Sequence, residues 1–164
     1  MKELFHRVSI RRFEDRPVEE EKITEILRAA MQAPSAKNQQ PWEFYVVRDK
    51  ELIRRLAASG PYSRPAETAP VVIVPVYRED CAAPAFAQVD MSIATENLWL
   101  MTDALGLGGV WIGTAPVEER MRAVEEILGI PAGLRAFAVF PLGYPAEQKE
   151  QKDRFDPARI HRIG

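Results

Sequence analysis

The sequence predicts an α/β or α+β fold in which helices cover most of a central sheet. Segments with helical spacing alternate with apolar, β-branched segments along the chain. Residues 70–77 are continuously apolar, which favours a strand buried on both faces over a strand with one solvent-exposed face. The length of 164 residues and the hydrophobic fraction of 46% are typical of one globular domain, which we expect to span residues 1–164.

The first half of the chain contains two predicted helices and two predicted strands. Apolar residues recur at helical spacing over residues 23–31, and Pro34 ends the pattern. The aromatic and β-branched residues 42–47 predict a strand. A second helix is expected from the cap residue Asp49 to residue 58. The strand at 70–77 follows, and its prolines predict irregular ends.

A long helix is predicted over residues 86–105, where neither proline nor glycine occurs. Its apolar residues cover most of the circumference, so the helix needs cover on most sides. We expect a partner subunit to supply part of that cover. A charge at Leu98 is then expected to disrupt the subunit contact.

The second half continues the alternation. The glycine-rich residues 106–109 end the long helix, and 110–113 predict a short strand. A helix over 117–128 begins after Pro116 and ends at Gly129, and a strand is expected over 134–142. The tail after Pro145 is charged and turn-like.

Composition argues against several functions. The 22 Lys and Arg against 24 Asp and Glu give a net charge of -2, so no overall field attracts nucleic acid. The single cysteine, Cys81, cannot form an internal disulfide, and His6 and His161 lie in no cluster with metal-ligand spacing. There is no signal-peptide pattern and no apolar run near the roughly 20 residues that a membrane span needs. We therefore expect a cytoplasmic protein without a metal.

Arg7, Ser9 and Arg11 form a candidate phosphate clamp. Each guanidinium can bind phosphate oxygens in a bidentate way, and the serine hydroxyl and nearby backbone N–H groups can complete the set. Taken alone, such a cluster is more often a solvated surface.

The sequence lacks both common nucleotide-binding fingerprints, the P-loop and the Rossmann glycine turn. Residues 106–113 are rich in glycine but follow a helix and enter a strand, which reverses the Rossmann order. Asn38 and Gln40 fit either a turn or the polar edge of a heteroaromatic ring. Lys152 and Arg154 by default belong to a solvated tail.

The order of these motifs resembles the nitroreductase family of FMN-dependent oxidoreductases. The match consists of Arg-x-Ser-x-Arg near the N-terminus, Ala-Pro-Ser-x-x-Asn-x-Gln-Pro-Trp over residues 33–42, a long apolar helix ending in Gly-Leu-Gly-Gly, then Gly-Tyr-Pro at 143–145 and Lys-x-Arg at 152–154. The resemblance extends over nearly the whole chain.

The resemblance implies an α+β, nitroreductase-like fold, with a mostly antiparallel central sheet flanked by helices, in an intertwined homodimer with FMN at the interface. It implies reduction of electron-poor small molecules, such as nitroaromatics or quinones, by ping-pong hydride transfer from NADH or NADPH. No side-chain acid or base is required, so we assign no catalytic residue. Either Arg11 or Lys37 is a candidate for the cation near N1 and O2 of the flavin.

Carried over motif by motif, the resemblance assigns the cofactor-binding positions. The phosphate and ribityl positions are Arg7, Val8, Ser9, Arg11, Lys152 and Arg154. The positions that contact the flavin from the other subunit are Pro34, Ser35, Ala36, Asn38 and Gln40. The positions whose backbone lies against the ring are Trp111, Ile112 and Gly113.

Three alternatives stay open at this point. A specialised member of the same family, such as a reductive dehalogenase, would share the fold. A non-catalytic flavin-binding module would keep the dimer without a substrate site. A dimer without any cofactor is the third.

Overall fold

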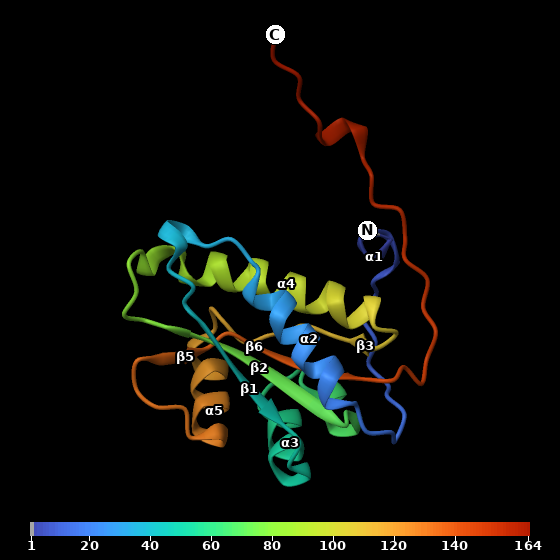
Figure 1. The fold of residues 1–164 in the computed structure, drawn as a ribbon, viewed down its shortest axis with the longest axis vertical. Helices are drawn as coiled ribbons and strands as arrows, with labels where there is room; N and C mark the ends of the chain where they lie inside the picture. The colour runs from blue at the N-terminus through green and yellow to red at the C-terminus, as the bar shows by residue number, and fades with distance from the viewer. Residues whose placement is uncertain (1) are drawn as a thin grey trace.

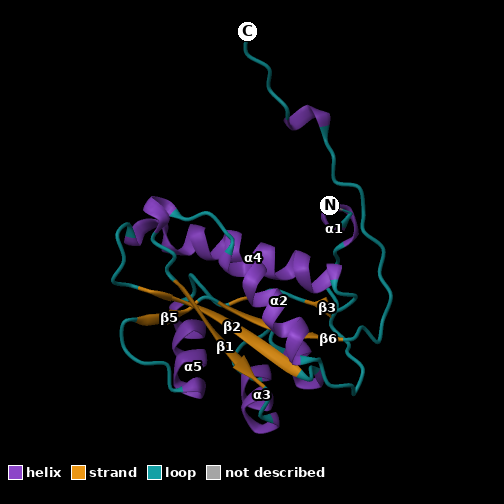
Figure 2. Ribbon diagram, in the orientation of Figure 1, coloured by secondary structure: helices purple, strands orange, loops and turns teal. Residues whose placement is uncertain are grey.

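A computed structural model describes residues 2–164, and its strands form one open, antiparallel arrangement with helices on both faces (Figures 1 and 2). The strands are β1 (Trp42–Val47), β2 (Val71–Arg78), β3 (Gly108–Gly109), β4 (Ile112–Gly113), β5 (Leu134–Ala136) and β6 (Ala138–Gly143). The α-helices are α1 (Glu3–His6), α2 (Glu20–Met31), α3 (Lys50–Ala57), α4 (Ala87–Ala104) and α5 (Glu118–Leu128). Short 3₁₀ turns occupy Ala36–Asn38, Arg64–Thr68, Pro84–Phe86 and Pro157–Arg159. The α+β architecture expected from the family resemblance is confirmed.

Strand β2 lies between β1 and β6 and is buried almost throughout, as its apolar sequence predicts. Val72, Val74 and Val76 pack in one core with residues of α3 and α5. Val71 and Ile73 pack in the other core with residues of α2 and α4. The alternation of side chains along a strand therefore divides a continuous apolar run between two helical layers.

The predicted strand 134–142 is interrupted, and this is a difference from the sequence prediction. Val76 pairs with Ala136, but Ile73 pairs with Phe140, so three residues on one strand oppose two on the other. Such an extra residue is a β-bulge. Pro75 lies at this point of β2 and has no N–H to donate, while its carbonyl accepts a hydrogen bond from Phe137 N at 2.9 Å.

Most helix boundaries agree with the sequence prediction to within a few residues. The Asp49 carboxylate accepts a hydrogen bond from Leu52 N at 2.8 Å, which confirms the predicted cap of α3. Gly129 ends α5 with a left-handed φ of 62°. Helix α1 was not predicted, since four residues leave no periodic pattern.

Helix α4 has two kinds of apolar residue. Leu98 is completely buried in the core shared with α2, so the expectation that it lies in a subunit contact is wrong. Val89 and Ile93, by contrast, are 54% and 36% exposed. The apolar circumference of α4 is therefore covered by its own chain on one side and open on the other.

The glycines at 108 and 109 are required by packing within the chain. A Cβ at Gly108 would lie 2.7 Å from Ile10, and one at Gly109 would lie 2.6 Å from Phe140. Ile10 N donates a hydrogen bond to the Gly109 carbonyl at 3.0 Å. The glycine pair thus lets the N-terminal segment lie directly against β3.

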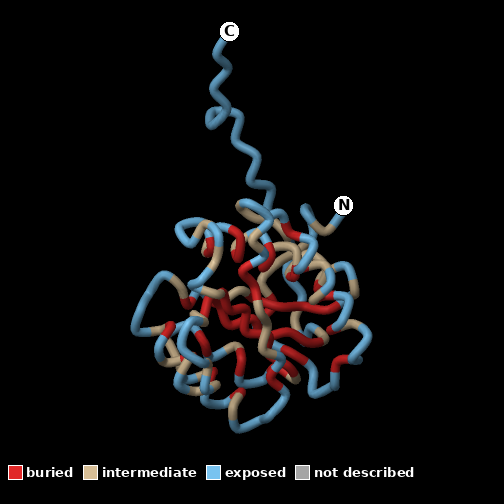
Figure 3. The backbone as a smooth tube through the Cα atoms, turned by 60° about the vertical axis from the view of Figure 1, so that its left-hand side comes forward, coloured by how far each residue is buried: buried red, intermediate tan, exposed pale blue. Residues whose placement is uncertain are grey.

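The C-terminal tail beyond Tyr144 first runs beside the N-terminal segment and then projects from the body, where it is exposed (Figure 3). Its apolar side chains Phe155, Ile160 and Ile163 are among the exposed ones. Over residues 2–164, no helix combines the length and apolar character that crossing a membrane would need.

Candidate functional site

Residues from both ends of the chain line one cavity of about 440 Å³. The predicted clamp residues are all present in this lining: Arg7, Val8, Ser9, Arg11, Lys152 and Arg154. Lys149, Glu150, Gln151 and Trp99 complete it. We call this the clamp cavity. Five cationic side chains against one carboxylate give the lining an excess of positive charge.

Contacts from the tail hold the N-terminal segment in place. Gln151 Nε2 donates a hydrogen bond to the Arg7 carbonyl at 2.7 Å, and Lys149 Nζ donates to the Ser9 carbonyl at 3.2 Å. The Glu147 carboxylate accepts from Arg11 N at 2.5 Å and from Lys149 Nζ at 3.0 Å. Glu147, Lys149 and Gln151 were not predicted as site residues. Their hydrogen bonds hold the backbone of residues 7–11, which carries the predicted arginines.

The Glu147 carboxylate has a lowered pKa. Burial alone would raise the pKa, but hydrogen bonds from the Arg11 amide and from Lys149 outweigh it and hold the pKa below the ordinary 4.5. Glu147 is therefore ionised at neutral pH, and its charge favours both bonds.

The Arg7 side chain is largely covered, at 13% exposed. Its guanidinium lies 3.8 Å from the centre of the Trp99 ring, and its Nε is 3.6 Å from Glu96 Oε1. The indole Nε1 of Trp99 is buried and has no hydrogen-bond partner within residues 2–164. Helix α4 thus positions Arg7 through Glu96 and Trp99.

The segment 34–40 forms a second, separate part of the candidate site. Lys37, Asn38 and Gln40 have left-handed φ values of 53°, 51° and 44°. The Asn38 and Gln40 side chains are exposed and bond each other through Gln40 Nε2 and Asn38 Oδ1 at 3.0 Å. Pro34 is also exposed, whereas Ser35 and Ala36 are half-buried.

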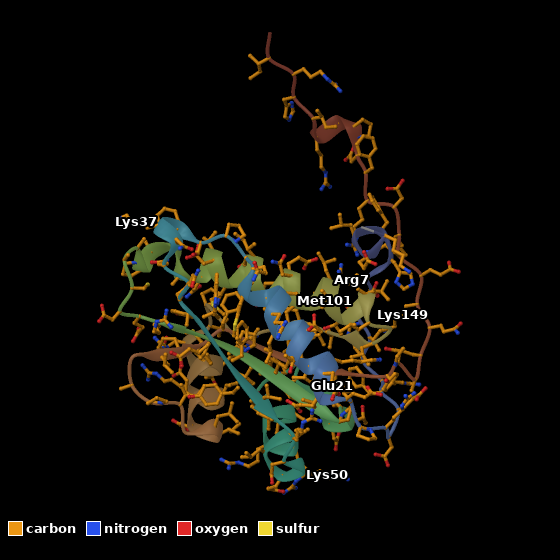
Figure 4. The ribbon with its side chains drawn as sticks, viewed as in Figure 1. Arg7, Glu21, Lys37, Lys50, Met101 and Lys149 are labelled. Carbon is orange, nitrogen blue, oxygen red and sulfur yellow. The ribbon has the colours of Figure 1, made fainter. Side chains whose placement is uncertain are left out.

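The two parts lie toward opposite ends of α4 within one chain. Figure 4 shows Lys37 at one end of the helix, and Arg7 and Lys149 at the other. Ala36 contacts Asp90, while Arg7 contacts Trp99, nine residues further along α4. At the usual helical rise this separation is about 14 Å along the axis. The structure therefore does not bring residues 34–40 of a chain into its own clamp cavity.

The third predicted group lies in and beside β4. Ile112 is buried, Trp111 is half-buried and packs on Phe137 with ring centres 5.5 Å apart, and Gly113 is exposed. A Cβ at Gly113 would meet nothing within 4 Å. Packing within the chain therefore does not require a glycine at position 113, whereas it does at position 109.

Comparison with known proteins identifies the family of the chain. The model of the nitroreductase family matches residues 4–59 and 58–144. An inferred NADH dehydrogenase/NAD(P)H nitroreductase of Archaeoglobus fulgidus is 43% identical over 99% of this chain and 96% of its own.

Two solved structures share the fold over nearly full length. An FMN-dependent nitroreductase from Clostridium difficile superposes with a TM-score of 0.92 at 30% identity, covering 99% of this chain and 98% of its own. An inferred nitroreductase from Desulfovibrio desulfuricans, in complex with FMN, superposes with a TM-score of 0.84 at 29% identity, covering 99% and 96%. Together with the family match, these findings establish that the chain belongs to the nitroreductase family.

Proposed function

We propose that this protein is an FMN-dependent oxidoreductase that uses NADH or NADPH to reduce electron-poor small molecules such as nitroaromatics or quinones. The clamp cavity is the observation that carries the proposal, since it gathers Arg7, Arg11 and three further cations around one space. The relatives' names, NAD(P)H nitroreductase and FMN-dependent nitroreductase, support the same activity.

The residues of the clamp cavity fit an FMN phosphate. A phosphomonoester carries about 1.5 to 2 negative charges at neutral pH and has three strong acceptor oxygens. Arginine forks, lysine ammonium groups and the Ser9 hydroxyl are the donors that such a group prefers.

The proposal includes a homodimer in which each FMN contacts both chains. The clamp and segment 34–40 are about 14 Å apart along α4, so one chain alone does not surround a ligand with both. The open face of α4 with Val89 and Ile93, and the exposed Phe86 beside it, supplies apolar surface for a second copy. Segment 34–40 of one protomer would then meet the flavin held by its partner.

When bound, FMN supplies the hydride acceptance and donation that the reaction needs. The chain's own contribution is to hold and orient the flavin. The clamp residues fix the phosphate end, and the exposed backbone at Gly113 leaves room for a flat ring beside β4. Asn38 and Gln40 offer amide donors and acceptors to the polar edge of the ring. The cation near that edge is Arg11 or Lys37.

The test is anaerobic stopped-flow mixing of the purified protein with NADH and with NADPH, after mass analysis of the bound chromophore. Prompt bleaching of a yellow flavin spectrum, followed by reoxidation with a quinone or nitroaromatic, is the expected result. A flavin that stays oxidised in excess nicotinamide would identify the non-catalytic binding module instead. Protein that is colourless and takes up no added FMN would refute the proposal.

Two finer expectations belong to the same proposal. Residues 1–164 act as a single FMN-binding domain, located in the cytoplasm. A halogenated tyrosine included among the acceptors tests the dehalogenase alternative, because halide release coupled to nicotinamide oxidation would assign that specialised activity.

A further inference from the structure

We propose that Asp90 is a positioning residue, whose buried carboxylate holds segment 35–40 in the conformation that contacts the flavin. The inference rests on the proposed function, because that function assigns the segment to the cofactor. Asp90 lies in the first turn of α4, is only 3% exposed, and is absent from the motifs that carry the family resemblance.

Both oxygens of Asp90 are used by the segment. Oδ1 accepts a hydrogen bond from Ala36 N at 3.0 Å, and Oδ2 accepts one from Gln39 Nε2 at 2.6 Å. Gln39 in turn bonds Ala83 twice: its Nε2 donates to the Ala83 carbonyl at 3.1 Å, and its Oε1 accepts from Ala83 N at 2.6 Å. Each oxygen of this buried carboxylate thus accepts one hydrogen bond that ties the segment to the start of α4.

The segment needs such anchors because its backbone is strained. Left-handed φ is unfavourable for residues that carry a side chain, and Lys37, Asn38 and Gln40 all adopt it. Residues with such unfavourable φ values persist only where surrounding contacts hold them, and they are found preferentially at functional sites. Arg78 supplies a second anchor from β2, since its Nη2 donates to the Gln40 carbonyl at 2.5 Å.

The anchors and the presented groups are different residues. Asp90, Gln39 and Arg78 hold the segment from the inside, while the Asn38 and Gln40 side chains remain exposed and bond each other. A segment that is already fixed in its binding conformation loses less conformational entropy when it binds a ligand. Asp90 therefore acts on the flavin through Asn38 and Gln40, without contacting it.

The first variant is Asp90→Asn, which keeps the shape but removes the charge and one acceptor. We expect FMN affinity to fall about tenfold, the cost of weakening hydrogen bonds to a buried charge. We also expect the visible circular dichroism of bound FMN, at saturating concentration, to change. Asp15→Asn is the matched control, since Asp15 is exposed and lines a different cavity beside α3. It should behave as the wild type.

Gln39→Ala gives a second, independent test should Asp90→Asn not fold. It should weaken FMN in the same way, and the double variant should lose less than the two single losses combined, because both act through one network. Wild-type affinity and an unchanged flavin spectrum in the folded variants would overturn the positioning role while leaving the proposed function intact. A wild-type protein that binds no FMN would overturn both.

Discussion

Replacement of Glu147 by glutamine tests whether the tail builds the clamp. The Glu147 carboxylate is 19% exposed and accepts hydrogen bonds from Arg11 N at 2.5 Å and Lys149 Nζ at 3.0 Å. Bonds to a charged group contribute about 1.5 to 3 kcal/mol, and glutamine keeps a neutral acceptor, so the expected loss is about 1 to 2 kcal/mol. For a protein of this size that lowers Tm by about 3 to 6 °C.

The same variant should weaken FMN binding, because Arg11 loses the contact that fixes its backbone. Thermal unfolding of the apoprotein and titration with FMN, followed by flavin fluorescence, measure the two effects. The control is Glu150→Gln, which removes a carboxylate from the same stretch of tail and from the lining of the clamp cavity. It should leave Tm unchanged and bind FMN at least as tightly as the wild type. Equal Tm and equal FMN affinity in both variants would refute the reasoning.

The pH dependence of this contact has a definite sign. The pKa of Glu147 in the folded protein lies below the ordinary 4.5, so its contribution is present above that value and is lost as pH falls through the folded pKa. The Tm difference between wild type and Glu147→Gln should therefore be full at pH 6 and shrink once pH falls below 4.5. A difference that grows on acidification would contradict the assignment.

The remaining predictions concern the clamp, the dimer and the glycines. Arg11→Ala should weaken FMN by about 1.5 to 3 kcal/mol in a titration, and unchanged affinity would remove Arg11 from the clamp. Val89→Glu should separate the dimer in sedimentation without unfolding the chain, since Val89 is 54% exposed; a dimer that persists would point to another contact face. Gly109→Ala should cost about 1 to 3 kcal/mol in urea unfolding, because its Cβ would lie 2.6 Å from Phe140. Gly113→Ala, with open space around it, should leave stability unchanged and lower FMN affinity; the opposite pattern would exchange the roles of the two glycines.

Local patterns were sufficient to predict the elements that local interactions determine. The cap at Asp49 and the left-handed end at Gly129 depend on residues close in sequence, and both are confirmed. The interruption at Phe137 was missed because it depends on Pro75, a residue of another strand. The burial of Leu98 was missed for a related reason. When apolar residues lie on every side of a helix, the sequence does not show which side packs against the rest of the same chain.

The same distinction applies to the site. Arg7 and Arg11 stand out in sequence because they form a compact motif, and in the structure they line one cavity with Lys152 and Arg154. Glu147 and Gln151 carry no such signal, since their partners are 136 and 144 positions away. An isolated glutamate or glutamine in a charged tail is ordinarily a solvated residue. Only the fold distinguishes these two from their neighbours.

Helix α4 connects the two parts of the candidate site. Asp90 in its first turn holds segment 35–40, and Glu96 and Trp99 further along hold Arg7. Because a helix is stiff, the spacing between the loop and the clamp is set by the number of residues between those contacts. Under the dimer proposal, two copies that meet along this helix would each place a loop at a fixed distance from the partner's clamp. An insertion or deletion in α4 should therefore impair FMN binding even where it changes no residue that contacts the cofactor.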